Sequence, residues 1–154
     1  MSGSVGDLVE DFELQDETGT TRKLTEFLDK GPVVLFFYPA AMTKGCTIES
    51  CHFRDLAAEF AELGAGRVGI SPDTVDKQRE FSDKHSFDFP LLSDPDGAVA
   101  TQFGVRRNIA LLATKRQTFV IGTDRTVLEV IKSEIRMAVH ADRALEVLRG
   151  RQNA

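Results

Sequence analysis

Cys46 and Cys51 are the two cysteines of this chain, and their type and spacing make them the residues best suited to chemistry. With four residues between them, they could form a structural disulfide, bind a metal ion, or divide a redox reaction between a nucleophile and a second thiol. A structural disulfide does not persist in a reducing cytosol, so a cysteine pair there is more typical of a catalytic or redox-sensing site. The geometry of the surrounding segment bears on this choice.

Both cysteines are predicted to lie on one helix that begins near Gly45. Apolar residues follow Cys46 at helical spacing through residue 63. At about 100° per residue, Cys46 shares the inward face with Phe53, whereas Cys51 lies about 160° away from Phe53. In an intact helix the Cα atoms of the two cysteines would be roughly 8.7 Å apart, and a disulfide needs about 4.4 to 6.8 Å. The cysteines can therefore bond only if the first turn unwinds, which suits a reaction cycle better than a static link.

The position of Cys46 in the first helical turn favours its thiolate form. Backbone N–H groups without helical partners and the positive end of the helix dipole stabilise a negative charge there, and Lys44 adds a nearby cation. An accessible thiolate is the form that peroxides oxidise to a sulfenic acid. A second thiol then condenses with the sulfenic acid to form a disulfide, and Cys51 has the spacing and the exposure to do this.

Two other interpretations stay open at this point. A cysteine on the apolar face of a helix is often only a small core residue, which would fit Cys46 but not the outward-facing Cys51. A metal could bind Cys46, Cys51 and His52, although the short C-x-x-C spacing of zinc modules is missing. The other histidines, His85 and His140, are distant from this segment and are predicted to have surface or capping roles.

The chain reads as a single domain over residues 1–154, without a linker or a repeat. The predicted elements are, in order, a hairpin at 11–24, a buried strand at 32–39, the helix at 46–63, a strand at 67–71, a helix at 75–87 capped by Asp73 or Thr74, an extended piece and turn at 90–97, a short helix at 98–105 ended by Gly104, a hairpin at 116–131 and a helix at 140–150 stopped by Gly150. Strands that alternate with helices early and a hairpin late predict an α/β fold with a mixed sheet. Residues 106–115 have no assigned structure and could form a core flap or a contact surface.

Charge and hydropathy argue against two classes of partner. The net charge is −5 and no stretch is dense in Lys and Arg, so the chain lacks the basic surface that binds nucleic acid. The longest apolar run, at 33–42, is about half as long as a membrane-spanning helix, and the acidic N-terminal segment lacks the apolar core of a signal peptide. The protein is therefore expected to be soluble and cytoplasmic, with neither nucleic acid nor a membrane as partner.

Pro39, Thr43 and Cys46 form the pattern P-x-x-x-T-x-x-C between a buried strand and a helix. This pattern resembles the active-site signature of peroxiredoxins, and Cys51 on the same helix resembles the peroxiredoxin Q branch, also called bacterioferritin comigratory protein. The segments that resemble that branch, in the same order, are GDLVEDFEL, VVLFFYP, GCTIESCHFRDL, GISPD, FPLLSDPDG, FGV, RQTFVI and HADRAL. The resemblance implies a thioredoxin-like fold, with a central mixed β-sheet flanked by helices and an N-terminal β-hairpin.

By this resemblance, Cys46 is the peroxidatic cysteine and Cys51 is the resolving one. Thr43 is expected to hydrogen-bond the thiolate and the peroxide through its hydroxyl, and Pro39 is expected to shield the pocket. Arg116, in the segment RQTFVI, matches the arginine that the family brings from a later strand. A guanidinium at that place would stabilise the thiolate and polarise the O–O bond.

Lys44 and Glu49 lie on either side of Cys46 in the sequence. Glu49 stands where the branch has a glutamate and is given an orienting role, with an ordinary first-turn acid as the alternative. Lys44 stands before Gly45, where the branch usually has a proline, so the loop backbone is looser and carries an added charge. This departure bears on how easily the helix unwinds and on the reactivity of the thiol, rather than on the type of chemistry.

The implied function is that of a thioredoxin-dependent peroxidase that reduces hydrogen peroxide and organic hydroperoxides. Cys46 would become a sulfenic acid, Cys51 would resolve it as an intramolecular disulfide, and thioredoxin or a similar dithiol reductant would reduce that disulfide. No metal, haem or flavin cofactor is implied, and a monomer is expected, with a dimer as the alternative. A thioredoxin-type dithiol reductase would need C-x-x-C in place of C-x-x-x-x-C. A non-enzymatic redox sensor and a metal-binding module remain as rivals that experiments can separate.

Overall fold

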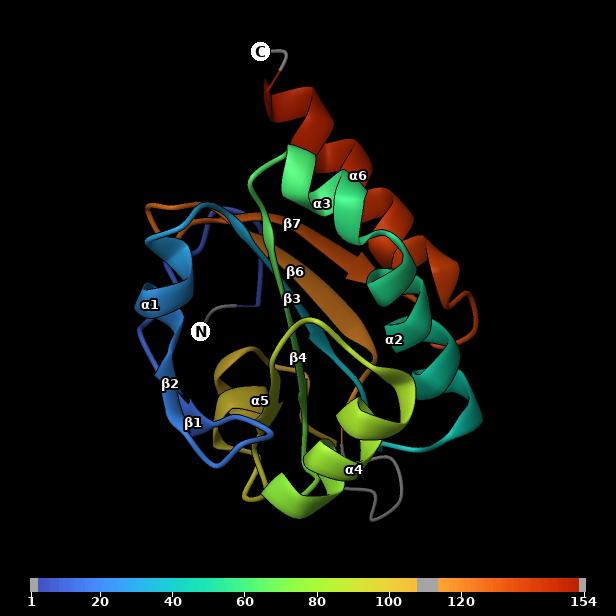
Figure 1. The fold of residues 1–154 in the computed structure, drawn as a ribbon. Helices are drawn as coiled ribbons and strands as arrows, with labels where there is room; N and C mark the ends of the chain where they lie inside the picture. The colour runs from blue at the N-terminus through green and yellow to red at the C-terminus, as the bar shows by residue number, and fades with distance from the viewer. Residues whose placement is uncertain (1–2, 108–113, 153–154) are drawn as a thin grey trace.

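A computed structural model of the protein describes residues 3–107 and 114–152. Within them, a seven-stranded mixed sheet runs through the molecule in the order β2-β1-β5-β4-β3-β6-β7 (Figure 1). The strands are β1 (Glu13–Gln15), β2 (Thr21–Lys23), β3 (Val33–Phe37), β4 (Gly66–Ser71), β5 (Leu91–Ser93), β6 (Gln117–Ile121) and β7 (Val127–Lys132). The helices are α1 (Leu24–Leu28), α2 (Lys44–Asp55), α3 (Ala57–Glu62), α4 (Val75–His85), α5 (Ala98–Gln102) and α6 (Ala138–Gln152). The predicted fold class is confirmed, including the N-terminal hairpin of β1 and β2.

Strand β3 lies in the interior of the sheet, between β4 and β6, and its five residues are all apolar and all buried. It pairs in parallel with β4 and antiparallel with β6. Since successive side chains of a strand point to opposite faces, Val33, Leu35 and Phe37 join one core, and Val34 and Phe36 join the other. A strand buried on both faces has no polar side, which is why its sequence is a continuous apolar run.

The two faces of the sheet are covered by different helices. Helices α1 and α5 pack with the N-terminal segment over one core, whereas α2, α3, α4 and α6 cover the other (Figure 1). On the second face, α2 docks through Phe53, whose ring stacks on Phe36 of β3 with the centroids 4.2 Å apart. This stacking fixes α2 against the strand that precedes it and so places the start of α2 beside the sheet.

The predicted helix at 46–63 is wrong in one respect, because the chain divides it into α2 and α3 at Leu56, where φ is −97° and ψ is 20°. In a continuous helix the carbonyl of Phe53 would accept from the N–H four residues later. Here it accepts instead from Nη1 of Arg67 on β4, at 2.9 Å. The side chain of Arg67, 14 residues later in the sequence, thus bonds the carbonyl that a continuous helix would use. Apolar spacing alone does not reveal such a partner.

Two predicted helix ends have different outcomes. Of the two candidate caps for α4, Thr74 is the one observed, because its side-chain oxygen accepts from the N–H of Lys77 at 3.3 Å. The predicted stop at Gly150 is wrong, since α6 continues to Gln152. A Cβ at Gly150 would meet open space, so no close packing or turn requires glycine there.

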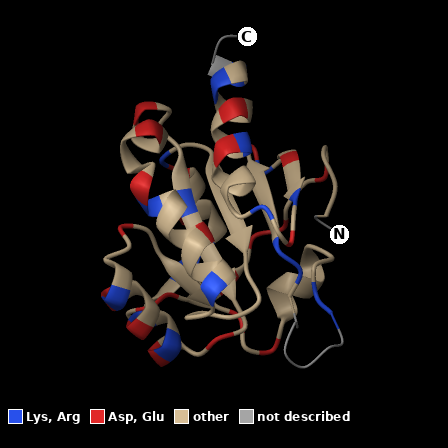
Figure 2. Cartoon of the chain, turned by 90° about the vertical axis from the view of Figure 1, so that its right-hand side faces the viewer, with Lys and Arg blue, Asp and Glu red and all other residues tan. Residues whose placement is uncertain are grey.

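Charged residues of both signs are interspersed over α2 and α6, and they do not form one basic surface on that side of the molecule (Figure 2). No helix in the described ranges is long and apolar enough to cross a membrane. The segment 106–115, predicted to be a core flap or a contact surface, lies mostly outside the described residues. At its two ends, Arg106 and Thr114 form an isolated antiparallel bridge.

Candidate active site

Cys46 lies in the first turn of α2, which begins at Lys44 after the N-cap residue Thr43. Its side chain is fully buried in the core between this helix and the sheet. Because the first N–H groups of a helix have no helical partner and the dipole is positive at that end, the position favours a negatively charged sulfur. The predicted placement at the helix start, facing inward, is confirmed. In this arrangement protein atoms enclose the side chain completely.

Arg116 immediately precedes β6 and reaches Cys46 from the strand next to β3. Its Nη2 donates to Sγ of Cys46 at 3.3 Å, and its Nη1 donates to Oε1 of Glu49 at 2.8 Å. Its backbone N–H donates to Oε2 of Glu134 at 3.0 Å. Burial lowers the pKa of Arg116, but Glu49 and Cys46 raise it by more, so the pKa ends above its ordinary value. A permanent positive charge therefore touches the sulfur.

Glu49 is fully buried one turn after Cys46 on α2. Burial raises the pKa of Glu49 to about 8, and the nearby Arg116 offsets only part of this rise. Near neutral pH the carboxyl group is therefore mostly protonated while its Oε1 still accepts from Arg116. Because a neutral Glu49 does not cancel the guanidinium charge, that charge stays available to Cys46. The alternative of an ordinary first-turn acid is wrong, since such an acid would lie at the surface.

Cys51 is half-buried further along α2, and both cysteines are free thiols in this structure. Burial raises the pKa of Cys51, with Arg54 lowering it and Asp55 raising it by smaller amounts. Near neutral pH, Cys51 therefore stays a neutral thiol, which is a weaker nucleophile than a thiolate. The roles of the two sulfurs in a reaction stay predictions.

Thr43 is exposed at the start of α2, and its hydroxyl donates to the carbonyl of Ala40 at 2.8 Å. Within the described residues that hydroxyl makes no hydrogen bond to Cys46, so the contact implied by the resemblance is not present in this arrangement. Its oxygen can still accept a hydrogen bond, for example from the O–H of a peroxide. Pro39 is half-buried in the connection from β3 to α2. The roles of both residues stay predictions.

Gly45 allows Arg116 to approach the start of α2 closely. A Cβ at this position would lie 3.2 Å from Nη2 of Arg116 and 3.0 Å from Cε of Met137. Distances this short leave almost no room for a side chain. Met137, half-buried just before α6, therefore lies with Arg116 against the first turn of α2.

Two polar groups that are buried near the site were not predicted from the sequence. His140 was expected at the surface or in a cap, but it is fully buried, with Nδ1 2.7 Å from Oγ1 of Thr118 and Nε2 2.8 Å from the carbonyl oxygen of Ser133. Tyr38 is also fully buried and donates its O–H to Oε1 of Gln78 at 2.6 Å. Burial raises the pKa of Tyr38 well above its ordinary value. The position of Tyr38 at the end of an apolar run was a usable signal, whereas His140 has no comparable local pattern.

The metal-binding interpretation gains no support from the geometry around the cysteines. Nε2 of His52 lies 2.7 Å from Oδ1 of Asp142 on α6, so this histidine is paired across the helix interface. Over residues 3–107 and 114–152, no three His, Cys, Asp or Glu side chains are grouped as a metal site would require.

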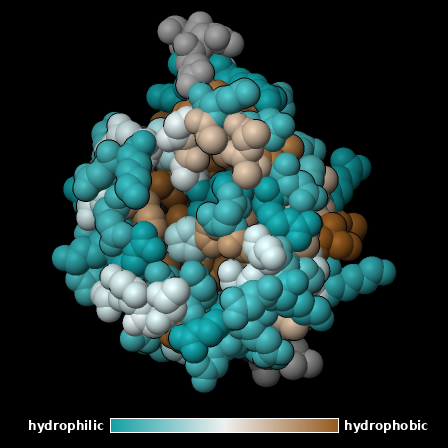
Figure 3. Space-filling view, in the orientation of Figure 1, coloured by the Kyte–Doolittle hydropathy of each residue, from teal (hydrophilic) through white to brown (hydrophobic). Residues whose placement is uncertain are grey.

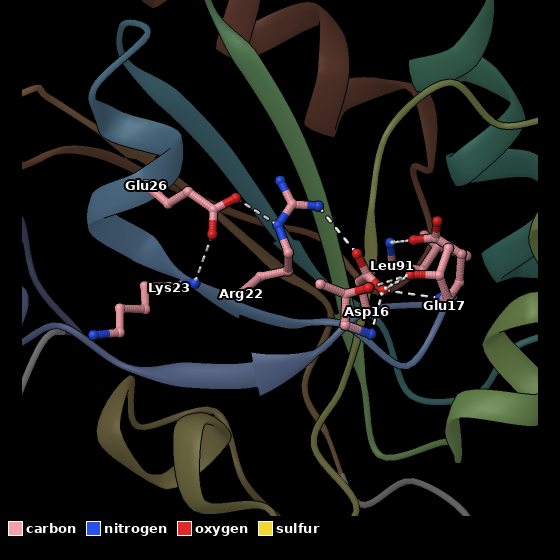
Figure 4. Close-up of polar contacts among 8 residues, drawn as sticks. Asp16, Glu17, Arg22, Lys23, Glu26 and Leu91 are labelled. Atoms are coloured by element: carbon pink, nitrogen blue, oxygen red, sulfur yellow. Dashed lines mark hydrogen bonds and ion pairs between the residues drawn. The ribbon is translucent and has the colours of Figure 1, made fainter.

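A cavity of about 520 Å³ lies away from the cysteines, between α1, β4 and the N-terminal hairpin. It is visible as a hollow with an apolar floor in Figure 3. Arg22 on its wall is held by Oε2 of Glu26 at 2.6 Å and by Oδ2 of Asp16 at 3.0 Å (Figure 4). Arg67 donates to both carboxylate oxygens of Asp88, at 3.0 and 2.7 Å. Because these cations already have partners within the protein, the cavity does not identify a ligand.

A mixed sheet of thioredoxin-like type, with a cysteine in the first turn of a helix and a buried arginine on its sulfur, defines a thiol-dependent redox protein. Comparison with known proteins identifies the family, because the AhpC/TSA family matches residues 5–130. The chain belongs to this family and, within it, to the peroxiredoxins of the Q/Bcp branch. It is therefore a peroxidase.

Individual relatives agree with this assignment along nearly the whole chain. The crystal structure of peroxidoxin BcpB from Mycobacterium tuberculosis is 61% identical, with a TM-score of 0.93 over 96% of this chain and 97% of that one. Peroxiredoxin Bcp from Bacillus subtilis (strain 168) is 35% identical over 97% of both chains. The bacterioferritin comigratory protein of Xanthomonas campestris, studied for its alkyl peroxide reduction activity, is 31% identical, with a TM-score of 0.84 over 94% of this chain and 99% of that one. The resemblance to the peroxiredoxin Q branch is confirmed.

Proposed function

We propose that Cys46 is the peroxidatic cysteine of this peroxidase. Its thiolate attacks the terminal oxygen of a hydroperoxide, ROOH, in line with the O–O bond. The S–O bond forms as the O–O bond breaks, so Cys46 is oxidised to a sulfenic acid, and the leaving RO⁻ takes up a proton to become ROH. The observation that carries the proposal is the 3.3 Å contact between Nη2 of Arg116 and Sγ of Cys46.

Arg116 supports this step through its charge and its shape. Negative charge moves from the sulfur to the leaving oxygen as the O–O bond breaks, and a planar guanidinium has enough N–H donors to contact both atoms. Because the partner carboxyl of Glu49 is mostly neutral near neutral pH, it holds the guanidinium in place without cancelling its charge. The positive charge is thus fixed before the peroxide arrives, which is the arrangement that stabilises a transition state.

Cys51 is the proposed resolving residue. Its thiol attacks the sulfenic sulfur of Cys46, an S–S bond forms and water leaves. Both cysteines lie on α2, where an intact helix keeps their Cα atoms roughly 8.7 Å apart, beyond the reach of a disulfide. The first part of α2 must therefore unwind in this step. The half-buried and neutral state of Cys51 supports its role as the second thiol to react.

The proposed substrates are hydrogen peroxide and organic hydroperoxides. The work on alkyl peroxide reduction by the Xanthomonas campestris relative supports the second class, as does the apolar side chain of Met137 against Gly45. Thioredoxin or a similar dithiol would reduce the Cys46–Cys51 disulfide and become a disulfide itself. We place this cycle in the reducing cytoplasm, where such dithiols are kept reduced, and we expect the protein to act as a monomer.

Peroxide consumption in the presence of thioredoxin and its reductase tests the proposal. Cys46→Ser is expected to abolish consumption, because a serine hydroxyl cannot form a sulfenic acid. Cys51→Ser is expected to reduce a single equivalent of peroxide and then to stop turning over with thioredoxin. Full thioredoxin-dependent turnover by Cys46→Ser would contradict the proposal. Turnover of the native protein no faster than that of free cysteine would instead favour a redox sensor.

A further inference from the structure

His140 is a fully buried histidine in the first turn of α6, directly behind the residues that hold Cys46. Its Nδ1 lies 2.7 Å from Oγ1 of Thr118, and its Nε2 lies 2.8 Å from the carbonyl oxygen of Ser133. The same Nε2 lies 3.6 Å from Oε2 of Glu49. Neither the proposed peroxide step nor the proposed disulfide step uses this histidine. It nevertheless lies between Thr118, Ser133 and Glu49.

The hydrogen bonds determine where the ring carries its proton. A backbone carbonyl can only accept, so Nε2 must donate to Ser133, and the neutral ring then leaves Nδ1 to accept from the hydroxyl of Thr118. Burial lowers the pKa of His140, the carbonyl of Ser133 raises it, and the charge of Arg116 lowers it again, with a net downward direction. His140 is therefore a neutral ring with one fixed tautomer near neutral pH.

Each group that His140 contacts either holds Arg116 directly or lies next to a residue that does. Thr118 lies on β6, only two residues beyond Arg116, which immediately precedes that strand. Ser133 precedes Glu134, whose Oε2 accepts the backbone N–H of Arg116. Glu49 binds the guanidinium through Oε1, while its Oε2 has no hydrogen-bond partner among the described residues and faces Nε2 of His140.

We propose that His140 is a positioning residue of the peroxidase site. It holds Arg116 against Cys46 by fixing three groups around this arginine: strand β6, the segment that carries Glu134, and the side chain of Glu49. The inference rests on the proposed roles of Cys46 and Arg116. The ring does not touch Cys46 in this arrangement, so it acts through the groups beside it. Without the two ring nitrogens, Thr118 and the carbonyl of Ser133 lose their hydrogen-bond partner, and the guanidinium of Arg116 would lose its fixed distance from the sulfur.

The effect should be visible in the pH dependence of the reaction, because the groups around His140 are charged or titratable. They are Cys46 and Glu49 from α2, Arg116 from the start of β6, and Glu134 from the segment before α6. Glu134 is also within 3.3 Å of Arg107. A change in how these groups are held alters the charge that the sulfur experiences, whereas a loss of general stability does not.

His140→Leu tests the proposal, because leucine fills similar space without either nitrogen. We expect the second-order rate constant for peroxide to fall about tenfold, less than the roughly hundredfold that removal of a direct donor causes, and the rate–pH profile to shift. His140→Gln, which keeps one N–H donor, should recover part of the rate. The matched control is His85→Leu, which makes the same change at a histidine packed on Phe81 and Phe87 outside the site and should leave the rate unchanged. The chain has no tryptophan, so loss of peroxide is a better signal than protein fluorescence.

A folded His140→Leu protein with the native rate and the native pH profile would overturn the inference. If His140→Leu does not fold, Thr118→Val removes the hydroxyl bonded to Nδ1 and leaves the ring in place. Thr118→Val is expected to shift the pH profile in the same direction by a smaller amount, and an unshifted profile would again overturn the inference. The proposed function fails separately, since it depends on the loss of turnover in Cys46→Ser.

Discussion

Nη2 of Arg116 lies 3.3 Å from Sγ of Cys46, although 70 residues separate the two in the sequence. The contact joins the start of β6 to the first turn of α2, and Nη1 of the same guanidinium binds Glu49 one turn further along that helix. One planar group thus holds two residues of the helix that must unwind in the proposed cycle. Unwinding removes both partners from a buried cation, which is energetically costly. The intact form of α2 is therefore the state to which the site returns after the disulfide is reduced.

The first prediction concerns the shape of the cation. Arg116→Lys keeps the positive charge but cannot bind Cys46 and Glu49 with two separate N–H arms. We expect the second-order rate constant for peroxide to fall about 100-fold, the effect of losing one donor to a developing charge. Peroxide consumption by the purified variant measures this. A lysine variant within about threefold of the native rate would show that charge alone is sufficient.

The second prediction concerns the close approach at Gly45. In Gly45→Ala the new Cβ would lie 3.2 Å from Nη2 of Arg116 and 3.0 Å from Cε of Met137, so one of the two must move. We expect about a tenfold loss of the peroxide rate, because a displaced reacting geometry is costly for catalysis. The double variant Gly45→Ala/Met137→Ala gives the methyl group room on one side and should recover part of the rate. Equal rates for the single and double variants would mean that Met137 does not transmit the effect.

The third prediction concerns Lys44, the first residue of α2. Thr43 before it has φ −79° and ψ 157°, a conformation that a following proline accepts. Proline at the first helical position stiffens the unwound chain, and compatible substitutions of this kind stabilise by about 0.4 to 1 kcal/mol. Lys44→Pro should therefore slow disulfide formation about two- to fivefold and increase overoxidation of Cys46 to the sulfinic acid.

Lys44→Ala is the control for this prediction, because it removes the charge without stiffening the chain. Its rate of disulfide formation should stay close to that of the native protein. The time course is followed by acid quenching and mass spectrometry after a pulse of peroxide. If Lys44→Pro forms the disulfide as fast as Lys44→Ala does, stiffness at this position does not control the unwinding of α2.

The fourth prediction concerns Glu49 and pH. Its pKa is about 8 in the folded protein against 4.5 for the exposed group, so the folded state holds the proton more tightly. The stabilising effect of this difference is complete below pH 4.5 and declines as the pH rises toward 8. The native protein should therefore lose more unfolding free energy between pH 5 and pH 8 than Glu49→Gln, as measured by urea denaturation followed by circular dichroism. Equal losses in the two proteins would contradict the raised pKa.

The elements that depend on local sequence were predictable, and those that depend on distant partners were not. Strand β3 was predictable because a strand buried on both faces leaves a continuous apolar run. The division of one helix into α2 and α3 was not, because Arg67 on β4 takes the carbonyl of Phe53. The continuation of α6 past Gly150 was not predictable either, and no close contact at Gly150 explains it.

The same distinction applies to the site. Cys46 could be placed at a helix start from apolar spacing, and the resemblance supplied Arg116, which the structure brings to its sulfur. The burial of Glu49 and His140 could not be predicted, because it results from the packing of α2 and α6 over the sheet. The inward placement of Cys46 was predictable, but the segment that carries Met137 and lies against the start of this helix was not, because it is distant in the sequence.

Mass spectrometry after one equivalent of peroxide tests the division of labour between the two cysteines most directly. The native protein should form an intramolecular Cys46–Cys51 disulfide, and Cys51→Ser should carry a sulfenic acid on Cys46 that a dimedone label traps. A native protein that keeps a sulfenic acid on Cys46 while Cys51 stays reduced would contradict the account. So would a Cys46→Ser protein in which peroxide oxidises Cys51 as fast as it oxidises Cys46 in the native chain.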